Sequence, residues 1–292
     1  MLSLHTNASS LSAQVSMGKT QSALSTSMTR LSTGYRINSA MDDAAGLQIA
    51  TRLKAQTSGM AVAMRNTQNA TSMMQTAEGS LNEVTNMLVR MKDLATQAAD
   101  ASSSSSDQDA MQAEYDALTG ELSNLMSNTT FGGQNLFNTG SGALATGKLT
   151  FQVGAASSET MDVDVSTALG TLDTDLAAAS TEYDGSGAYA VATGAELTGG
   201  NANATIDALS TAIDSVGTVR SQLGAASNSL EHVYNNLSNM STNVTQAAGR
   251  ITDVDYATET SNMTSQQMLL QAGTAMLKQS NSMSQMVMSL MQ

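Results

Sequence analysis

Few side chains in this sequence could do chemistry. The 292 residues include no Cys and only two His, His5 and His232, so the chain offers no thiolate nucleophile and no His-Glu-x-x-His zinc motif. Three Asp-x-Asp pairs could contact a cation, but none continues into the glycine and distal glutamate of a calcium loop: Asp162/Asp164, Asp173/Asp175 and Asp253/Asp255. We interpret these pairs as solvated strand or turn residues. The sequence therefore predicts a protein that is not an enzyme, with no cofactor and no metal ion.

The composition favours long helices that pack on one another. No Pro interrupts the chain, aromatic residues make up 3% of it, and Met is abundant at 21 residues. Pro would break a helix interior, and large rings normally supply much of a globular core. Met is an adaptable apolar filler. The composition thus disfavours a conventional enzyme core and favours helix–helix packing.

The charge is distributed very unevenly. The net charge is −13, and residues 100–200 account for all of it, with fourteen acidic residues and one basic residue, Lys148. Residues 1–41 contain no acidic residue, and Lys278 is the only charged residue after Glu259. This balance argues against nucleic-acid binding, which needs clustered Lys and Arg. Ends with so little charge can pack against copies of themselves without strong repulsion.

No targeting or membrane segment is visible in the sequence. The first residues lack the basic and apolar regions of a cleaved signal peptide, and no run approaches the roughly 18 apolar residues that span a bilayer. We therefore expect no membrane insertion. The expected location is the cytoplasm, unless export uses a route without a cleaved signal.

A heptad repeat predicts the main element of the architecture. Every seventh residue is aliphatic from Leu209 to Ile251, and a second apolar series runs three positions later, from Ala212 to Val254. This alternating spacing of three and four residues is that of a coiled-coil seam. At about 1.5 Å per residue, such a helix extends over roughly 70 Å. Its length disfavours the alternative of an amphipathic helix in a globular core.

Two further seams predict partner helices. One spans residues 49–98 with interruptions at Gln56 and Thr67, and the other spans residues 111–125. The sequence Ser39–Asp42 resembles a capping box in front of the first of these helices. Three long helices with apolar stripes must bury those stripes against one another. The sequence thus predicts a mainly α fold built on a long antiparallel coiled-coil helical bundle.

Both ends of the chain carry amphipathic segments of their own. Apolar residues recur at helical spacing at Leu4, Leu11, Leu24 and Leu31, and again at Leu269, Met276, Met283, Val287 and Leu290. Isolated amphipathic segments without packing partners are marginally stable. We therefore predict that both ends are disordered in the free monomer, and that these residues form packing contacts between subunits.

The middle of the chain holds the only β signal. Apolar and polar residues alternate at 149–153 and at 161–165, and residues 154–158 between them begin with a glycine. The pattern predicts a small hairpin with one wet face. Residues 166–205 are rich in Gly, Ala, Ser and Thr. We expect them to be too few and too polar to build a further large domain.

Three motifs resemble bacterial flagellin. The stretch Leu31–Leu47 (LSTGYRINSAMDDAAGL) closely resembles the N-terminal signature of that family. Arg250–Met263 (RITDVDYATETSNM) resembles its C-terminal partner, and Phe131–Phe137 (FGGQNLF) is similar to the turn after the third helix. The resemblance covers roughly residues 1–165 and 205–292, and long paired motifs of this kind are highly specific. It indicates a short flagellin without the large outer domains of many members.

The resemblance implies a fold and a function. It implies paired terminal helices that form an inner tube, with the helical bundle outside them. It implies a structural subunit that polymerises with many copies of itself into the flagellar filament used for motility. The corresponding segments are 1–41 (inner-tube helix and connecting loop), 42–205 (bundle helices, hairpin and short acidic outer segment), 206–256 (C-terminal bundle helix) and 257–292 (inner-tube helix).

The resemblance also implies partners and a location. These partners are the flagellar type III export apparatus, an export chaperone, and the filament cap and junction proteins. The location is the extracellular flagellum, reached with an uncleaved export signal. Some flagellins are also recognised by a host Toll-like receptor, and the matching positions here are Arg90, Leu94, Gln97 and Glu114. The alternative that Arg90 and Glu114 are simply exposed bundle residues stays open.

Two alternative functions remain at this point. A hook–filament junction protein shares the terminal motifs, although the unbroken match from residue 31 to residue 137 favours the filament subunit. An exported enzyme or adhesin on a flagellin-like frame would need an inserted domain with reactive side chains. The middle of this chain offers neither the size nor the His and Cys residues for one.

Overall fold

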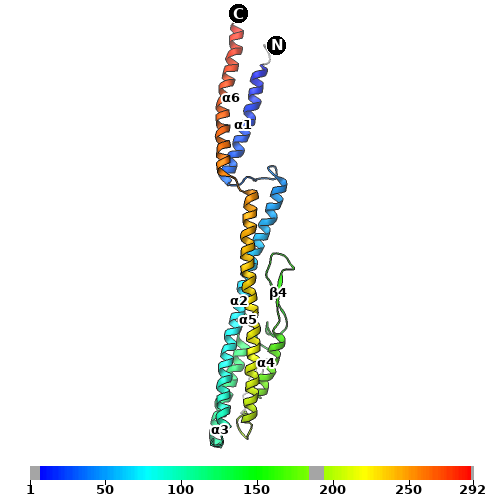
Figure 1. Cartoon of the computed structure of the whole chain (residues 1–292), viewed down its shortest axis with the longest axis vertical. Helices are drawn as coiled ribbons and strands as arrows, with labels where there is room; N and C mark the ends of the chain where they lie inside the picture. Colours follow the sequence, from blue (N-terminus) through cyan, green and yellow to red (C-terminus); the bar gives the residue numbers. More distant parts are fainter. Residues whose placement is uncertain (1–6, 184–193, 291–292) are drawn as a thin grey trace. The chain divides into compact units, whose positions relative to one another are not determined.

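The protein is built mainly from helices (Figure 1). The computed structural model describes residues 7–183 and 194–290, with the backbone alone at positions 284 and 287–290. Within these residues the elements are α1 (Ala8–Thr33), α2 (Ala44–Ala98), α3 (Ser105–Asn128), β1 (Thr130–Phe131), β2 (Gln134–Asn135), β3 (Leu149–Gln152), β4 (Thr160–Val163), α4 (Ser166–Ala179), α5 (Ala202–Thr252) and α6 (Tyr256–Leu290). The predicted fold class, a long helical bundle with a small hairpin and paired terminal helices, is confirmed.

The chain divides into two compact units. The terminal unit comprises residues 1–57 and 242–292, and the bundle unit comprises residues 58–241. The helices α2 and α5 belong partly to one unit and partly to the other. The boundary between the units therefore falls inside two continuous helices and not in a linker.

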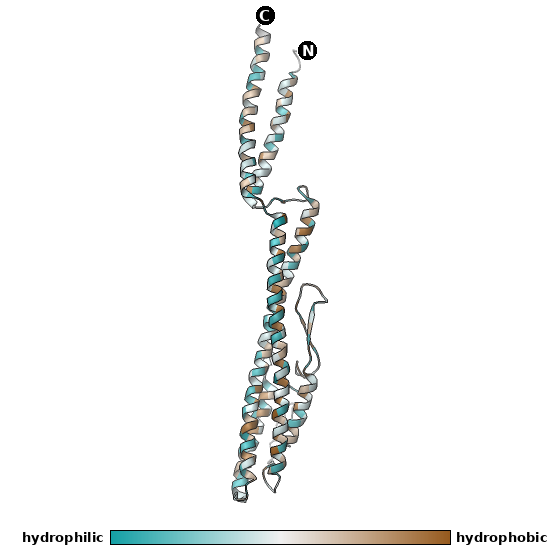
Figure 2. Cartoon of the chain, viewed as in Figure 1, coloured by the Kyte–Doolittle hydropathy of each residue, from teal (hydrophilic) through white to brown (hydrophobic). Residues whose placement is uncertain are grey.

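The core of the bundle unit follows the predicted seams. The α2 seam residues from Met60 to Ala98 are each at most 2% exposed, and the α5 seam residues from Leu209 to Leu223 are each at most 1% exposed. The apolar stripe of α5 is visible in Figure 2. Thr67 interrupts the α2 seam and is itself buried, but its Oγ1 donates a hydrogen bond to the Ala63 carbonyl at 2.8 Å. The hydroxyl is thereby satisfied within the helix, so the seam tolerates it.

The same two seams are less well covered in the terminal unit. Ile49 on α2 is 40% exposed. Leu53 on α2 is partly buried, as are Val244 and Ile251 on α5. This part of each helix therefore retains apolar surface that the chain itself does not bury.

A helix that the sequence analysis did not predict covers the bundle. The helix α4 lies in the stretch expected to be too short and too polar for a further large domain, and it buries Leu169, Leu172 and Leu176. These leucines have the three-and-four spacing of an amphipathic helix, so the signal was present in the sequence. The small and polar residues between the leucines made the helical pattern weak. Tyr115 of α3 fixes the end of α4, because its hydroxyl donates a hydrogen bond to the Ala179 carbonyl at 2.6 Å.

The predicted hairpin is present as β3 and β4. The two strands pair antiparallel, with Leu149 opposite Val163 and Gln152 opposite Thr160. Each strand ends one or two residues before the alternating pattern does. The motif that resembles the flagellin turn forms a second, smaller antiparallel pair, β1 with β2. Its turn residues Gly132 and Gly133 have φ of 60° and 84°, which glycine adopts without strain.

The expected capping box at Ser39–Asp42 is not the cap of α2. The Asp42 carboxylate instead closes a turn before the helix, where it accepts hydrogen bonds from the Asn38 and Ser39 backbone N–H groups. The cap is Asp43, whose side chain accepts a hydrogen bond from the Gly46 N–H at 2.8 Å. An N-cap side chain bonds to the N–H three residues later, and α2 begins at Ala44, so only Asp43 has this spacing.

Candidate assembly surface

The terminal helices have well-defined ends. Asn7 caps α1, since its side-chain oxygen accepts a hydrogen bond from the Ser10 N–H at 3.1 Å. At the other end of α1, Gly34 adopts the left-handed conformation with φ of 77°, and its N–H donates to the Arg30 carbonyl. Asp255 precedes α6 and accepts hydrogen bonds from the Thr258 hydroxyl and the Ala257 N–H. These hydrogen bonds, that from Thr258 first, hold the pKa of Asp255 below its usual value.

The helices α1 and α6 lie side by side in the terminal unit (Figure 1). Their contact includes polar bonds: the Asn7 Nδ2 donates to the Ser280 Oγ at 3.1 Å, and the Ser10 Oγ donates to the Asn281 Oδ1 at 3.4 Å. A Cβ at Gly273 would lie 3.9 Å from the Cγ of Met17. Leu24 of α1 is buried, and Leu270 and Leu277 of α6 are partly buried. Part of the apolar surface of the two helices is therefore covered within the chain.

An exposed apolar surface remains on both terminal helices. We define the terminal stripe as Leu11, Val15 and Met28 of α1 with Met268, Leu269, Met276 and Met283 of α6, which are 47–66% exposed. Of the fourteen exposed large hydrophobic residues in the described part of the chain, only Val62 and Val89 belong to the bundle unit. Exposed apolar patches of this kind mark interaction surfaces. The terminal unit is therefore the candidate site of assembly.

The structure divides the predicted packing residues into groups. Leu11, Leu269, Met276 and Met283 are exposed, as a contact with another molecule requires. Leu24, in contrast, is 7% exposed, and Leu31 is partly buried, so both contribute to packing within the chain. Leu4 lies outside the described residues, as do the side chains of Val287 and Leu290.

A group of polar contacts, which we call the clamp, joins the loops next to the terminal helices to one another. The Arg36 N–H donates to the Thr252 carbonyl at 2.6 Å, and the Val254 N–H donates to the Gly34 carbonyl at 3.0 Å. Arg30 lies 3.8 Å from Glu259 and 4.0 Å from Asp42. Glu259 is 7% exposed, so water solvates its carboxylate poorly. The nearby guanidinium group of Arg30 compensates this buried charge. Sequence reasoning missed this clamp because its members are far apart along the chain.

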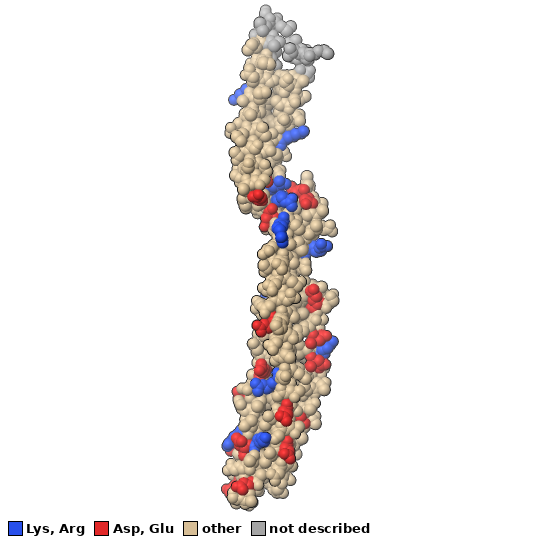
Figure 3. Space-filling view, viewed as in Figure 1, with Lys and Arg blue, Asp and Glu red and all other residues tan. Residues whose placement is uncertain are grey.

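The surface of the terminal helices carries little charge. Figure 3 shows α1 and α6 as largely uncharged surface. The basic residues of α1 are Lys19 and Arg30, and α6 carries Glu259 and Lys278. Copies of this surface can approach one another without strong repulsion.

The Asp-x-Asp pairs have structural partners. Asp162 accepts hydrogen bonds from the Lys148 Nζ at 2.9 Å and from the Thr150 Oγ1 at 2.7 Å, and these bonds lower its pKa. Asp173 accepts a hydrogen bond from the Tyr183 hydroxyl, and Asp175 accepts one from Ser215. Within residues 7–183 and 194–290, no group of three acidic or histidine side chains could hold a metal ion.

Nor does any helix of the described chain have the length and apolar character to cross a membrane.

The bundle unit contains a cluster of carboxyl groups that sequence reasoning missed. Glu182 is 3% exposed, and its carboxyl group lies beside those of Asp116 and Glu196. Burial, with the charges of Asp116 and Glu196 nearby, raises the pKa of Glu182 to about 7. Glu196 is better satisfied, because it accepts hydrogen bonds from the Thr181 N–H and from Gln112. No sequence signal pointed to this cluster, since its members come from separate segments.

The raised pKa predicts a pH-dependent stability. The folded state binds the Glu182 proton more tightly than the unfolded state, so this group favours folding at low pH, and the effect is lost as the pH rises through about 7. We expect Glu182→Gln to increase the free energy of unfolding by about 1–3 kcal/mol at pH 8 and by less at pH 5. Urea unfolding at the two pH values measures this difference. An equal effect of Glu121→Gln, which removes an exposed carboxylate on α3, would contradict it.

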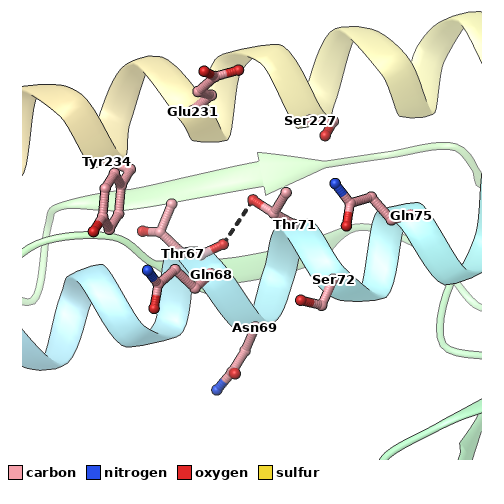
Figure 4. A pocket seen from close by; sticks show the side chains of 9 residues that line it. All are labelled: Thr67, Gln68, Asn69, Thr71, Ser72, Gln75, Ser227, Glu231 and Tyr234. Carbon is pink, nitrogen blue, oxygen red and sulfur yellow. Dashed lines mark hydrogen bonds between the residues drawn. The ribbon is translucent and has the colours of Figure 1, made fainter.

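The bundle unit also has a polar groove. It has a volume of about 640 Å³ and lies between the α2 residues 67–75 and the α5 residues 227–234. Figure 4 shows hydroxyl and amide side chains along it. Its only titratable side chains are Glu231 and Tyr234, and no His lines it. With one carboxylate, one phenol and otherwise only hydroxyl and amide side chains, the groove holds no pair of groups suited to acid–base catalysis.

The positions that match the pattern recognised by a Toll-like receptor lie on the bundle unit. Arg90 of α2 and Glu114 of α3 form an ion pair at 2.6 Å, with side chains 53% and 47% exposed. Gln97 is also exposed. Leu94 is only 2% exposed and belongs to the core, so its side chain is not available to a partner at this surface.

Comparisons with known proteins agree with these observations. Residues 4–141 match the bacterial flagellin N-terminal helical region, and residues 206–291 match the bacterial flagellin C-terminal helical region. The chain is 41% identical over 164 residues to polar flagellin F of Vibrio parahaemolyticus and 40% identical over 167 residues to B-type flagellin of Pseudomonas aeruginosa. These alignments cover 56% and 57% of this chain but only 42% and 33% of the relatives.

A solved structure shares the fold. A flagellar hook-associated protein from Vibrio parahaemolyticus superposes with a TM-score of 0.55 at 17% sequence identity, covering 73% of this chain and 100% of that one. Together, the two flagellin regions span most of the chain. The N-terminal and C-terminal motifs of the sequence lie within the matching regions, in the same order. The chain belongs to the bacterial flagellin family.

Proposed function

We propose that this protein is a structural subunit that polymerises into a bacterial flagellar filament and is not an enzyme. The observation that carries the proposal is the terminal stripe, a set of large apolar residues left exposed on two nearly uncharged helices. Burying one Leu or Met side chain contributes about 1.5–3 kcal/mol. Neighbouring copies that cover the stripe would gain this energy at several positions in each subunit.

The proposal also explains when the ends of the chain fold. The two helices leave the residues of the terminal stripe exposed within the chain, so neighbours that cover them would add to the stability of both helices. The sequence predicted that both ends are disordered in the free monomer, whereas the structure of the single chain has α1 and α6 as helices that lie against each other. Folding would be coupled to assembly.

Family membership supports the remaining partners and the location. We infer export through the flagellar type III apparatus with a chaperone, contact with the filament cap and junction proteins, and residence in the extracellular flagellum. Segments 1–41 and 257–292 would form the inner tube of the filament. Segments 42–205 and 206–256 would form the bundle around it.

A hook–filament junction protein is the alternative, and the similar hook-associated structure supports its fold only. The curated relatives, in contrast, are named as flagellins, which favours the filament subunit. The deciding experiment adds purified monomer to sheared filament seeds and follows the length of the filaments by negative-stain electron microscopy. We expect continuous elongation that consumes the monomer. Addition that stops after a short segment would support the junction role, and absence of any growth would contradict assembly altogether.

Receptor recognition is a second proposed function, supported by the exposed Arg90–Glu114 ion pair. An exposed ion pair contributes about 1 kcal/mol or less to folding, so Arg90→Ala should leave the monomer folded. If a Toll-like receptor contacts Arg90, we expect its signal to fall about tenfold or more, as for the loss of a central arginine in an interface. A receptor reporter assay on purified monomer measures this.

The matched control is Arg220→Ala. Arg220 forms an ion pair with Glu78 at 4.0 Å elsewhere on the bundle unit, and both side chains are partly exposed. This variant should signal like the wild type. Indistinguishable signals from wild type, Arg90→Ala and Arg220→Ala would remove the proposal.

A further inference from the structure

Methionine occupies two very different environments in this protein. Met60, Met74 and Met91 of the bundle unit are each 1% exposed and lie in the core. Met268, Met276 and Met283 of α6 are 59%, 66% and 57% exposed. All three belong to the terminal stripe, so the same side chain is fully protected in one unit and open to solvent on the candidate assembly surface of the other.

Exposed thioethers differ from exposed aliphatic groups in one chemical respect. The sulfur of Met accepts one oxygen atom from a peroxide to give methionine sulfoxide: the O–O bond breaks, the sulfur is oxidised by two electrons, and hydrogen peroxide is reduced to water. The product is polar, and methionine sulfoxide reductases return it to Met with two electrons from a dithiol, which becomes a disulfide while the oxygen leaves as water. Leu269 lies on the same stripe, is 54% exposed and has no such chemistry.

We propose that Met268, Met276 and Met283 are sites of reversible oxidation that controls assembly. The proposal rests on the proposed function, because the sulfoxides act by placing polar groups in the contact between subunits. A sulfoxide in such a contact would lose its hydrogen bonds to water, which weakens assembly about tenfold or more for each buried oxygen.

The proposal predicts an order of oxidation. In the folded monomer, hydrogen peroxide should convert Met268, Met276 and Met283 well before Met60, Met74 and Met91, as peptide mass spectrometry would show. In assembled filaments the stripe is covered, so the same three residues should react more slowly than in the monomer. Equal rates at exposed and buried positions in the monomer would overturn the proposal, as would equal rates in monomer and filament at the three stripe positions.

The closing experiment compares seeded elongation before and after treatment with hydrogen peroxide. The test variant carries Met268→Leu, Met276→Leu and Met283→Leu together with Met28→Leu and Met286→Leu, because Met28 and Met286 are also exposed on α1 and α6, at 47% and 62%. These changes keep the apolar area but cannot be oxidised. The matched control carries Met60→Leu, Met74→Leu and Met91→Leu in the core. We expect treatment to reduce elongation by wild type and core control at least tenfold, while the stripe variant elongates as before and sulfoxide reductase restores the wild type.

The outcomes separate this inference from the proposed function. If untreated wild type fails to elongate on seeds, assembly itself is refuted and this inference falls with it. If untreated protein elongates, two results overturn the inference alone: oxidised wild type that elongates normally, or a stripe variant that is inhibited as strongly as the wild type.

Discussion

Replacing Met283 by Asp should abolish filament growth and leave the monomer folded. Met283 is 57% exposed in the isolated chain, so the new carboxylate is hydrated there and costs little. In an assembly that covers the terminal stripe, the same carboxylate would be buried without a cationic partner. Such a charge costs about 3 kcal/mol or more, which raises the monomer concentration needed for growth roughly a hundredfold or more. Sedimentation after seeding measures growth, and circular dichroism checks the fold.

The control for this prediction is Gln267→Asp. Gln267 is also exposed on α6 but lies about 160° around the helix from Met283. The substitution Gln267→Asp introduces the same charge away from the terminal stripe, so this variant should elongate far better than Met283→Asp. Equal loss of growth in both variants would show that charge anywhere on α6 blocks assembly, and that the stripe has no special role.

The same substitution in two places should produce opposite phenotypes. Leu81→Ala removes a side chain that is 0% exposed in the core of the bundle unit, whereas Leu269→Ala removes one that is 54% exposed on the terminal stripe. We expect Leu81→Ala to lower the free energy of unfolding of the monomer by about 2–5 kcal/mol, because it leaves a cavity in a packed core. Chemical denaturation of the monomer measures this loss.

Leu269→Ala should have the reverse profile. Its effect on the unfolding of the monomer should be within about 0.5 kcal/mol, as for most surface substitutions. Its effect on seeded elongation should be clear, because the stripe loses apolar area in every subunit contact. If Leu269→Ala destabilises the monomer as much as Leu81→Ala, then α6 buries its stripe within the chain and the proposed assembly surface is wrong.

The bundle was predictable because its signal is repetitive. A heptad carried over six or more repeats specifies both the helix and its buried face, and the seams from Met60 to Ala98 and from Leu209 to Leu223 are indeed the core. The hairpin was predictable for a similar reason, since alternation with period two is specific to strands. Helix α4 was missed because three leucines in a stretch of small polar residues give a weak signal.

The candidate site was only partly predictable. Four residues of the terminal stripe were among the predicted packing residues: Leu11, Leu269, Met276 and Met283. Leu24 was also assigned to subunit packing, but it is buried within the chain. The spacing contained a clue. Leu24 follows Val15 by nine residues, which at about 100° per residue leaves the two side chains roughly 180° apart around the helix axis. Leu24 and Val15 therefore face opposite sides of α1. The clamp of Arg30 with Glu259 and Asp42, like the cluster around Glu182, had no sequence signal.

The sequence by itself determined which faces of the helices are apolar, where the long helices run, and which family the motifs resemble. Only the tertiary structure decided which apolar face is covered. On α6, Leu270 and Leu277 are partly buried while Leu269 and Met276 stay exposed, although each pair of neighbours along the chain is equally apolar. Periodicity describes a helix surface, but burial depends on the position of the partner helix. That position follows from contacts between residues such as Asn7 and Ser280, which lie at opposite ends of the chain.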